Sequence, residues 1–250
     1  MKRLIAFDLD GTLAESKQPI DAEMSALLAR LSQVAQVAVI SGGDWPQFQS
    51  QLLAQLPPTI DLSRWFVLPT SGTKLYRFAG GAWELAYAER LSDAERTRIV
   101  EELEAAVSAL GFIGDESWGP KIEDRGTQLT FSGLGQDAPL AAKRAWDPDF
   151  AKRKLLQQRL GPRLPGFAVR VGGSTSVDIT RIGVDKAYGL RKLAEASAVS
   201  IADMIFVGDA LYEGGNDAPV KATGVDTVAV RDITETKRVI ETICACLDHV

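Results

Sequence analysis

Two carboxylates, one residue apart, follow a short apolar segment near the start of the sequence. Asp8 and Asp10 stand in the run FDLDGT, which continues the apolar segment RLIAF. A hydrophobic strand has no packing reason to end on two acids, because a buried carboxylate without a partner is costly. Taken alone, the run could be a turn capped by an Asp side chain, but it also fits a strand that presents two carboxylates for chemistry.

More polar residues fall where other strands are predicted to end or where a helix is predicted to begin. In chain order they are Ser41 with Gly42, Lys186, Asp209, and Asn216 with Asp217. Three acids without a histidine or a cysteine beside them form an all-oxygen site, which suits Mg²⁺. A serine hydroxyl, a lysine ammonium and glycine amides are donors that can hold a phosphoryl group. The combination predicts a site for phosphoryl transfer.

The composition excludes several other classes of protein. The chain has 250 residues, and its net charge of -5 predicts no general attraction to nucleic acid or to membranes. No apolar run approaches the roughly 20 residues of a membrane span. His249 is the only histidine, which excludes serine–histidine triads and histidine-bound zinc. Cys244 and Cys246 are the only cysteines, so we expect a reduced, cytoplasmic protein.

Apolar runs alternate with helical patterns at both ends of the chain. Strands are predicted at 3–7, 37–43, 65–72, 204–209 and 226–230, and helices at 21–34, 185–197 and 233–247. Continuous apolar strands separated by helices indicate a parallel sheet that is covered on both faces. We therefore predict an α/β fold with a Rossmann-like parallel sheet, in which ligands bind at the carboxyl ends of the strands.

The middle of the chain has a different pattern. Residues 73–87 are predicted to form a hairpin, and residues 92–110 a charged amphipathic helix that begins with a capping box. Two later segments, 127–133 and 167–180, alternate apolar and polar residues as half-exposed antiparallel strands do. The expected domains are a parallel domain of 1–82 and 183–250, and an inserted α+β domain of 83–182.

In this order, the motifs D-x-D-G-T, Ser, Lys, and G-D followed by N-D resemble those of the haloacid dehalogenase (HAD) phosphotransferase superfamily. The resemblance implies that Asp8 is the nucleophile, which forms an aspartyl phosphate. Asp10 would be the general acid–base that protonates the leaving oxygen and then activates the acceptor. Ser41, Gly42 and Lys186 would hold the phosphoryl oxygens.

The same resemblance implies a magnesium site. Mg²⁺ would lie between Asp8, the carbonyl oxygen of Asp10, and Asp209, where it would let an anionic carboxylate approach an anionic phosphate. Asn216 and Asp217 would support the ligands of the metal. The implied partner is a small phosphorylated molecule, not a nucleic acid or a membrane.

Within the superfamily, the insert resembles the large α+β cap of the eukaryotic-type phosphomannomutases. The stretches that carry this resemblance are 122–136, 172–193 and 206–240. They imply that the cap contacts substrate through Arg125, Arg144, Ser176 and Asp178. Arginines fit this role because a sugar phosphate has a second anionic end, which a guanidinium can grip with two hydrogen bonds. Arg144 could equally be a solvated helix residue. The related mutases dimerise through their caps, and a homodimer of that kind stays open for this chain.

Three departures from those mutases bear on the reaction. Gln136 stands where they carry a further arginine, PTSG at 69–72 replaces an acidic-Asn-Gly turn, and ISGGD at 40–44 replaces VGGSD. A charge-assisted hydrogen bond contributes about 1.5–3 kcal/mol, so a missing arginine weakens the grip on the second phosphate. Water then has more opportunity to accept the phosphoryl group. We therefore expect a phosphohydrolase for a phosphorylated sugar, with a hexose-phosphate mutase as the first alternative and a phosphosugar-binding protein without turnover as the second.

Overall fold

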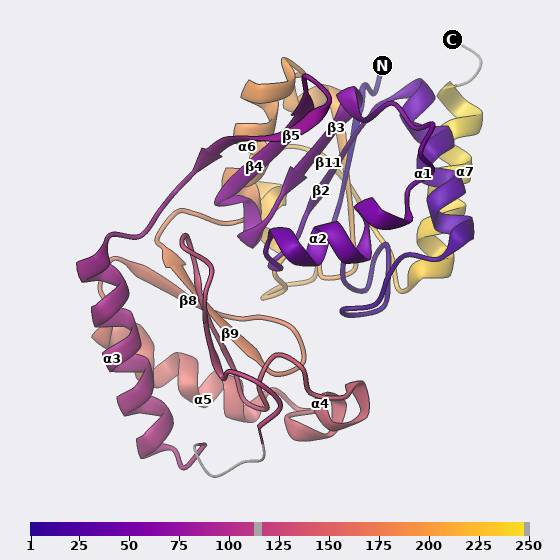
Figure 1. Cartoon of the computed structure of the whole chain (residues 1–250). Coiled ribbons are helices and arrows are strands. Elements are labelled where there is room, and N and C mark those ends of the chain that lie inside the picture. Colours follow the sequence, from indigo (N-terminus) through magenta and orange to yellow (C-terminus); the bar gives the residue numbers. More distant parts are fainter. Residues whose placement is uncertain (113–116, 248–250) are drawn as a thin grey trace. The chain divides into compact units, whose positions relative to one another are not determined.

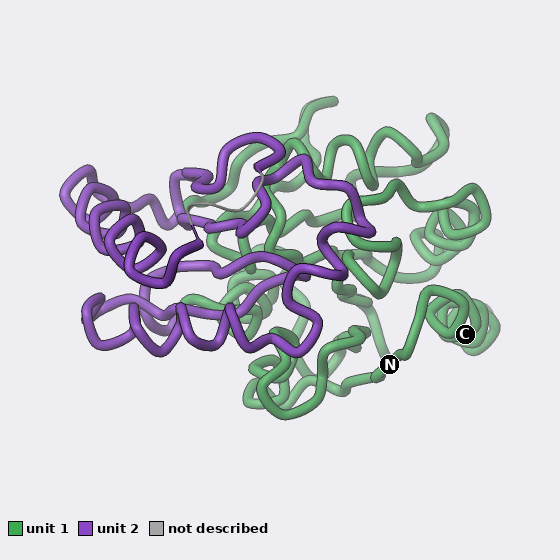
Figure 2. Tube along the Cα trace, turned by 90° about the horizontal axis from the view of Figure 1, so that it is seen from below, with its two compact units in different colours: residues 1–88, 184–250 green, residues 89–183 purple. Residues whose placement is uncertain are grey.

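The computed structural model of the chain describes residues 1–112 and 117–247, so His249 lies outside the described residues. The chain divides into two compact units (Figure 2). Unit 1 comprises Met1–Ala88 and Val184–Val250, and unit 2 comprises Glu89–Gly183. Unit 1 contains a mostly parallel sheet with helices, so the predicted fold class is confirmed.

The sheet of unit 1 joins parallel strands to an antiparallel hairpin. The strand order is β11 (Asp226–Ala229), β10 (Met204–Gly208), β1 (Leu4–Phe7), β2 (Gln36–Ile40), β3 (Trp65–Leu68), β4 (Lys74–Ala79) and β5 (Ala82–Ala88). Neighbours from β11 to β3 pair in parallel, whereas β4 pairs antiparallel with both β3 and β5. The carboxyl ends of β10, β1 and β2 therefore lie side by side at one edge of the sheet.

Helices cover both faces of this sheet (Figure 1). The helices of unit 1 are α1 (Ala22–Val34), α2 (Trp45–Gln51), α6 (Lys186–Ser197) and α7 (Ile233–Leu247). Ile5 and Phe7 of β1 join the apolar cluster of α1 and α7, whereas Leu4 and Ala6 join that of α6. Every residue of β1 is buried, which explains why its sequence is continuously apolar.

Unit 2 is an antiparallel sheet with helices packed on one face. Its strand order is β6 (Ile122–Asp124), β7 (Leu129–Ser132), β9 (Ser176–Arg181) and β8 (Phe167–Val171), and its helices are α3 (Asp93–Ala109), α4 (Leu140–Trp146) and α5 (Ala151–Leu160). α3 begins with the predicted capping box of Ser92 and Glu95. Leu129 and Phe131 of β7 join the apolar core with side chains of α3 and α5, so the residues between them face the other side of the sheet.

The first crossing between the units differs from the expected boundary. β5 pairs with β4 along its length, so residues 83–88 belong to the sheet of unit 1 and not to the insert. An alternating pattern marks a hairpin strand but does not indicate which sheet it joins. β3 is also shorter than the predicted strand at 65–72, because it ends at Leu68.

Short 3₁₀ segments connect the longer elements. They are Leu53–Gln55, Leu62–Arg64, Thr70–Gly72, Gly161–Arg163, Ile201–Asp203 and Ala218–Thr223. Among the helices of the described ranges, none combines the length and the apolar character that crossing a membrane requires.

Candidate active site

The parallel strands bring three of the predicted site residues to one edge of the sheet. Asp8 follows β1, Ser41 follows β2 and Asp209 follows β10. β1 pairs in register with both β2 and β10, so these strand ends are neighbours. Asp8 is only 3% exposed, and its backbone N–H donates to the carbonyl oxygen of Val207 at 3.0 Å. The sheet therefore fixes the backbone from which this carboxylate projects.

Lys186 joins the same edge from the first turn of α6. Its ammonium group donates to Asp8 Oδ1 and, at 2.6 Å, to Asp217 Oδ1. The side chain is 1% exposed, so these carboxylates replace the water that an ammonium group would otherwise bind. Asp185 caps the helix by accepting from the backbone N–H of Tyr188 at 3.0 Å. The cap fixes the point at which the helix begins and hence the place of Lys186.

Two glycines allow α6 to approach the turn after β3. A Cβ atom built on Gly72 would lie 2.5 Å from the Cα atom of Gly189, and Gly72 has a φ angle of +87°. A side chain at Gly72 would therefore both strain the backbone and push the helix away. The close contact sets the distance between α6 and the strand ends that carry the acids.

The charges of this cluster are strongly coupled. Burial raises the pKa of Asp8 well above its ordinary value; Lys186 lowers it in part, and repulsion from Asp217 and Asp209 adds to the rise. Burial alone would lower the pKa of Lys186, but the two carboxylates outweigh burial and raise it, so the residue is an ammonium ion. A nucleophilic Asp8 must be ionised. The site therefore needs positive charge beyond that of Lys186.

The carboxylates form a cluster with the chemistry of a divalent-cation site. One oxygen from each of Asp8, Asp209 and Asp217 lies within 4.8 Å of the others. An all-oxygen set of this kind fits Mg²⁺. Both oxygens of Asp217 already accept hydrogen bonds, one from Lys186 and one from Ala210 N at 3.0 Å. Asp8 and Asp209 are therefore the side chains of the cluster best suited to hold a cation, with Asp217 supporting them.

Thr12 and Gly11 place Asp209 beside the first strand. The Thr12 hydroxyl accepts from the backbone N–H of Asp209 at 3.1 Å and lies 3.4 Å from its Oδ1. A Cβ atom on Gly11, which has a φ angle of +90°, would lie 2.6 Å from Asp209 Oδ2. The glycine and threonine of the D-x-D-G-T run thus position an acid that lies about two hundred residues further along the chain.

The carboxylate of Asp10 is held by hydrogen bonds from two groups of unit 1. It accepts from the backbone N–H of Lys17 at 2.7 Å and from Gln47 Nε2 at 3.0 Å. Both contacts fix the orientation of a carboxylate that could move a proton. Gln47 lies in the short helix α2, where nothing in the sequence indicates a role in a site.

Ser41 lies in a turn that the segment after β3 holds in place. Ser41 is buried, and its hydroxyl accepts from Gly43 N at 3.3 Å. The backbone N–H groups of Thr70 and Ser71 donate to the carbonyl oxygens of Gly43 and Ser41, both at 2.8 Å. Thr70 and Ser71 reach these positions with φ angles of +51° and +58°, which L residues rarely adopt. The strained turn therefore fixes the backbone around the serine and Gly42.

Asn216 does not take part in the hydrogen bonds of the carboxylate cluster. The residue is exposed, whereas the adjacent Asp217 is fully buried. The family resemblance implied that both residues support the ligands of a metal. A turn closed by Gly215 N donating to the carbonyl oxygen of Tyr212 at 2.9 Å reverses the chain just before them, and neighbouring side chains then point in different directions.

The four cap residues of the sequence prediction all lie in unit 2. Ser176 and Asp178 are two residues apart in β9 and so share one face of the sheet. Asp178 accepts from the Thr130 hydroxyl at 2.8 Å, and Arg125 donates to Glu123 at 2.6 Å. Burial raises the pKa of Asp178, which Arg125 partly offsets. The structure thus brings three of the four together, whereas Arg144 is exposed on α4 and lies outside this sheet.

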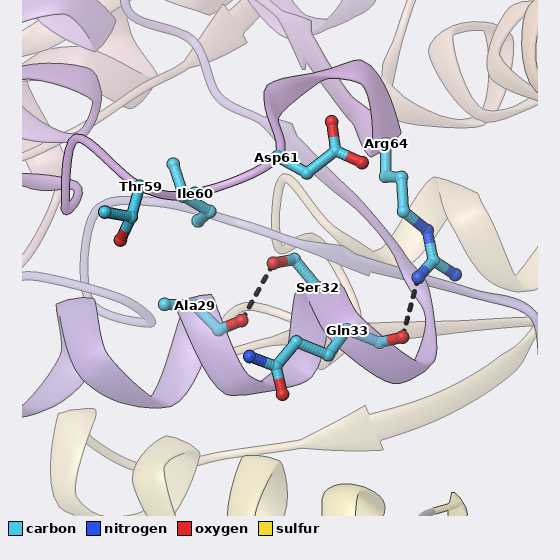
Figure 3. A pocket seen from close by; sticks show the side chains of 7 residues that line it. All are labelled: Ala29, Ser32, Gln33, Thr59, Ile60, Asp61 and Arg64. Carbon is cyan, nitrogen blue, oxygen red and sulfur yellow. Dashed lines mark hydrogen bonds between the residues drawn. The ribbon is translucent and has the colours of Figure 1, made fainter.

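A hollow of about 370 Å³ lies elsewhere in unit 1 (Figure 3). Ser32 and Arg64 line it and donate to the backbone carbonyl oxygens of Ala29 and Gln33 at 2.8 and 2.7 Å. It adjoins the end of α1 that leads into β2, whereas the acids follow the carboxyl ends of their strands. The hollow therefore belongs to the opposite edge of the sheet from the candidate active site.

Most of the chain matches a known protein family. The model of the family described as eukaryotic phosphomannomutase matches residues 24–245. The phosphomannomutase of Schizosaccharomyces pombe is 26% identical over 227 residues, which cover 86% of this chain and 84% of the relative. Phosphomannomutase 1 of Homo sapiens is 26% identical over 248 residues, which cover 95% of this chain and 91% of the relative.

Solved structures with low sequence identity share the fold. A haloacid dehalogenase-like hydrolase from Bacteroides thetaiotaomicron has a TM-score of 0.63 at 19% identity, covering 97% of this chain and 100% of its own. The IMP-bound IMP-nucleotidase of Plasmodium falciparum has a TM-score of 0.68 at 14% identity, covering 98% of this chain and 68% of its own.

Proposed function

The chain belongs to the eukaryotic phosphomannomutase family and is an enzyme with a HAD-type fold; we propose that it is a hexose-phosphate mutase. The buried cluster in which Lys186 donates to both Asp8 and Asp217 supports phosphoryl transfer, and the family match supports the choice of a mutase. Asp8 and Asp10 precede the residues matched by the family model. The D-x-D-G-T motif and the family match therefore support phosphoryl transfer independently.

In the first step, an oxygen of Asp8 bonds to the phosphorus of the substrate while the bond from phosphorus to the leaving oxygen breaks. Asp10 gives its proton to that oxygen. Lys17 N and Gln47 Nε2 keep the Asp10 carboxylate in place. Lys186 and the hydroxyl of Ser41 stabilise the negative charge on the phosphoryl oxygens.

In the second step, Asp10 takes the proton of a sugar hydroxyl. The oxygen of that hydroxyl bonds to phosphorus while the bond between phosphorus and Asp8 breaks, so the carboxylate is restored. When the acceptor is a different hydroxyl of a phosphorylated hexose, the outcome is isomerisation through a bisphosphate. When the acceptor is water, the outcome is hydrolysis.

Mg²⁺ is the proposed cofactor, and Asp8, Asp209 and the carbonyl oxygen of Asp10 would hold it. When bound, the ion neutralises charge and so favours the ionised, nucleophilic form of Asp8. Thr12 and Gly11 support this site because they fix the position of the Asp209 carboxylate.

The sequence expectation favoured a phosphohydrolase over a mutase, and the comparisons support the mutase better. The relatives are named as phosphomannomutases, and the matches cover 84% and 91% of their lengths. Hydrolysis stays the second candidate because Gln136 supplies no positive charge where those mutases carry an arginine.

The test is an assay of two products in parallel. With Mg²⁺ and a hexose 1,6-bisphosphate activator, we expect mannose 1-phosphate to become mannose 6-phosphate with little release of phosphate. Steady phosphate release without isomerisation would establish the phosphohydrolase instead. Binding without either product would revive the non-catalytic alternative.

A variant pair tests the role of Asp8 in the same assay. Asp8→Asn should abolish turnover, whereas Glu213→Gln, at an exposed acid in the loop after Asp209, should retain it. Turnover by the Asp8→Asn chain would refute the assignment of the nucleophile.

A further inference from the structure

A tyrosine near the end of β5 reaches the turn that follows β3. The hydroxyl of Tyr87 donates to the carbonyl oxygen of Gly72 at 2.6 Å. The side chain is half-buried, and its ring packs against the apolar cluster of α6. The sequence prediction did not include Tyr87, because the residue lies outside every motif of the candidate active site.

A bulge in β5 gives Tyr87 its direction. Two neighbouring residues of β4, Leu75 and Tyr76, pair with residues that are two apart in β5, so β5 contains one extra residue there. Trp83, before the bulge, packs on the apolar cluster of α1 and α7, whereas Tyr87, after it, packs on that of α6. In a regular strand these two side chains would share one face. The bulge therefore turns Tyr87 toward the face of the sheet that α6 covers.

Tyr87 also contacts the helix that begins at Lys186. Its ring meets the ring of Tyr188 edge to face, with centroids 6.4 Å apart and an interplanar angle of 88°. Gly189, the next residue of α6, is the one that Gly72 approaches closely. Tyr87, the turn after β3 and α6 therefore meet at one place in unit 1.

The turn that Tyr87 contacts is strained and supports the backbone of the candidate site. Thr70 and Ser71 have φ angles of +51° and +58°, and such strain persists only where the surroundings hold the residues in place. Their backbone N–H groups donate to carbonyl oxygens of the loop that begins at Ser41. If the turn relaxed, it would withdraw both donors from that loop. The hydrogen bond to Gly72, the next residue of the turn, opposes this relaxation.

We infer that Tyr87 is a positioning residue for the phosphoryl group of the substrate. Its hydrogen bond to Gly72 keeps the strained turn in the conformation that holds the Ser41 hydroxyl and the Gly42 backbone in place. The inference rests on the proposed function, because that function assigns the Ser41 hydroxyl to the phosphoryl oxygens. It holds whether the acceptor is a sugar hydroxyl or water, since both reactions use the same phosphoryl pocket.

The test measures how tightly orthovanadate, an anion that takes the place of a phosphoryl group, binds the full chain with Mg²⁺. Tyr87→Phe removes only the hydroxyl and keeps the ring against Tyr188, so the variant should melt within a few degrees of the parent. Titration calorimetry should show a Kd for vanadate raised about threefold to tenfold, the change expected for one neutral hydrogen bond. An unchanged Kd would overturn the inference.

Ser25→Ala is the matched control. The buried Ser25 hydroxyl also donates to a backbone carbonyl oxygen, that of Gln55 at 2.7 Å, from a helix that contributes no residue to the candidate site. This variant loses a hydrogen bond of the same kind and should also melt within a few degrees of the parent, but its Kd for vanadate should not change. An equal rise of Kd in Ser25→Ala and Tyr87→Phe would overturn the inference, because general stability would then explain both.

A second substitution tests the route through the strained turn. Glycine adopts a positive φ angle without the strain that a serine has there, so Ser71→Gly makes the turn less dependent on Tyr87. It keeps the backbone N–H that donates to the carbonyl oxygen of Ser41. We expect Tyr87→Phe to raise the Kd for vanadate less in the Ser71→Gly background than in the parent. An equal or larger rise in that background would overturn the inference.

These experiments separate the inference from the proposed function. Isomerisation by the parent, with an unchanged Kd in Tyr87→Phe, would keep the mutase and overturn the inference. Phosphate release without isomerisation, together with a raised Kd in Tyr87→Phe, would refute the mutase and support the role of Tyr87. A parent chain that binds no vanadate in the presence of Mg²⁺ would overturn the inference, because it would have no phosphoryl pocket for Tyr87 to support.

Discussion

Unit 1 and unit 2 each hold a cluster of charged side chains, but they compensate those charges differently. In unit 1, Lys186 faces the carboxylates of Asp8 and Asp217, with that of Asp209 close by. In unit 2, Arg125 pairs with Glu123, and both Arg125 and Arg170 of β8 act on the charge of Asp178. The first arrangement has excess negative charge and needs a cation, which suits phosphoryl transfer. The second is balanced without one.

Removing Lys186 is expected to give the largest effect. Lys186→Met leaves two buried carboxylates without their cation and should lower the free energy of unfolding by about 3–5 kcal/mol, as well as abolish turnover. Mg²⁺ should restore part of the lost stability, because it compensates the same acids. Urea unfolding with and without Mg²⁺ measures both effects.

Lys192→Met provides the control for that change. Lys192 lies on the same helix and pairs at the surface with Glu195 at 3.0 Å, so its loss should cost less than about 1 kcal/mol. If the Lys186→Met chain were as stable as the parent, the buried carboxylates of unit 1 would not depend on Lys186 to compensate their charge, which would contradict the comparison.

Breaking a buried ion pair in unit 2 is expected to give the next largest loss of stability. Arg153 and Asp147 are both nearly inaccessible and meet at 2.7 Å, and Arg153 also donates to the carbonyl oxygen of Gly173 in the loop before β9. Arg153→Met should cost about 3–5 kcal/mol of stability by leaving Asp147 unpaired. Unlike Lys186→Met, it should gain nothing from Mg²⁺.

A substrate without a sugar tests whether the two units have different roles in the reaction. Under conditions where Arg153→Met stays folded, we expect it to raise KM for hexose phosphates while kcat for p-nitrophenyl phosphate changes little. A loss of kcat for the aryl phosphate equal to that in Lys186→Met would contradict a division of labour between the units.

The smallest predicted effect is a pH-dependent one at the surface of unit 2. Arg181, which donates to Glu95 at 2.7 Å, and the Ser92 backbone lower the pKa of Glu95 from 4.5 to about 2. A lowered folded-state pKa stabilises the protein above the unfolded-state pKa, and the gain is lost as pH falls through the folded-state value. Glu95→Gln should therefore cost about 0.2–1 kcal/mol at neutral pH and only a small part of that near pH 2.

Glu104→Gln is the control, at an exposed acid on the same helix. Thermal unfolding from pH 7 to pH 2 should show no pH-dependent difference between this variant and the parent. A Glu95→Gln deficit that persists at pH 2 would show that lost helix capping, and not the charge, explains the cost.

The sequence predicted the parts of the site that strand ends determine. Asp8, Ser41 and Asp209 each follow an apolar run, and parallel pairing necessarily brings such ends to one edge. The place of Asp217 opposite Lys186 depends on how a loop folds back, and Gln47 reaches Asp10 from a short helix. Neither contact follows from the local pattern of the sequence, because both depend on tertiary packing.

Arg170 illustrates the same limit in unit 2. Alternation predicts that it shares a face with its strand neighbours two residues away, but only the pairing of β8 with β9 places it opposite Asp178. The expected boundary at 82/83 missed β5 for a similar reason, because only its pairing with β4 places it in unit 1. The homodimer, the cytoplasmic location and the substrate contact of Arg144 stay predictions.

The central claim is that Asp8 carries the phosphoryl group. The most direct measurement is to mix the enzyme with Mg²⁺ and ³²P-labelled hexose 1,6-bisphosphate, quench in acid, and map the label to a peptide. We predict label on the peptide that contains Asp8, retained in Glu213→Gln and absent in Asp8→Asn. Label on any other peptide, or turnover without label on this one, would contradict the account.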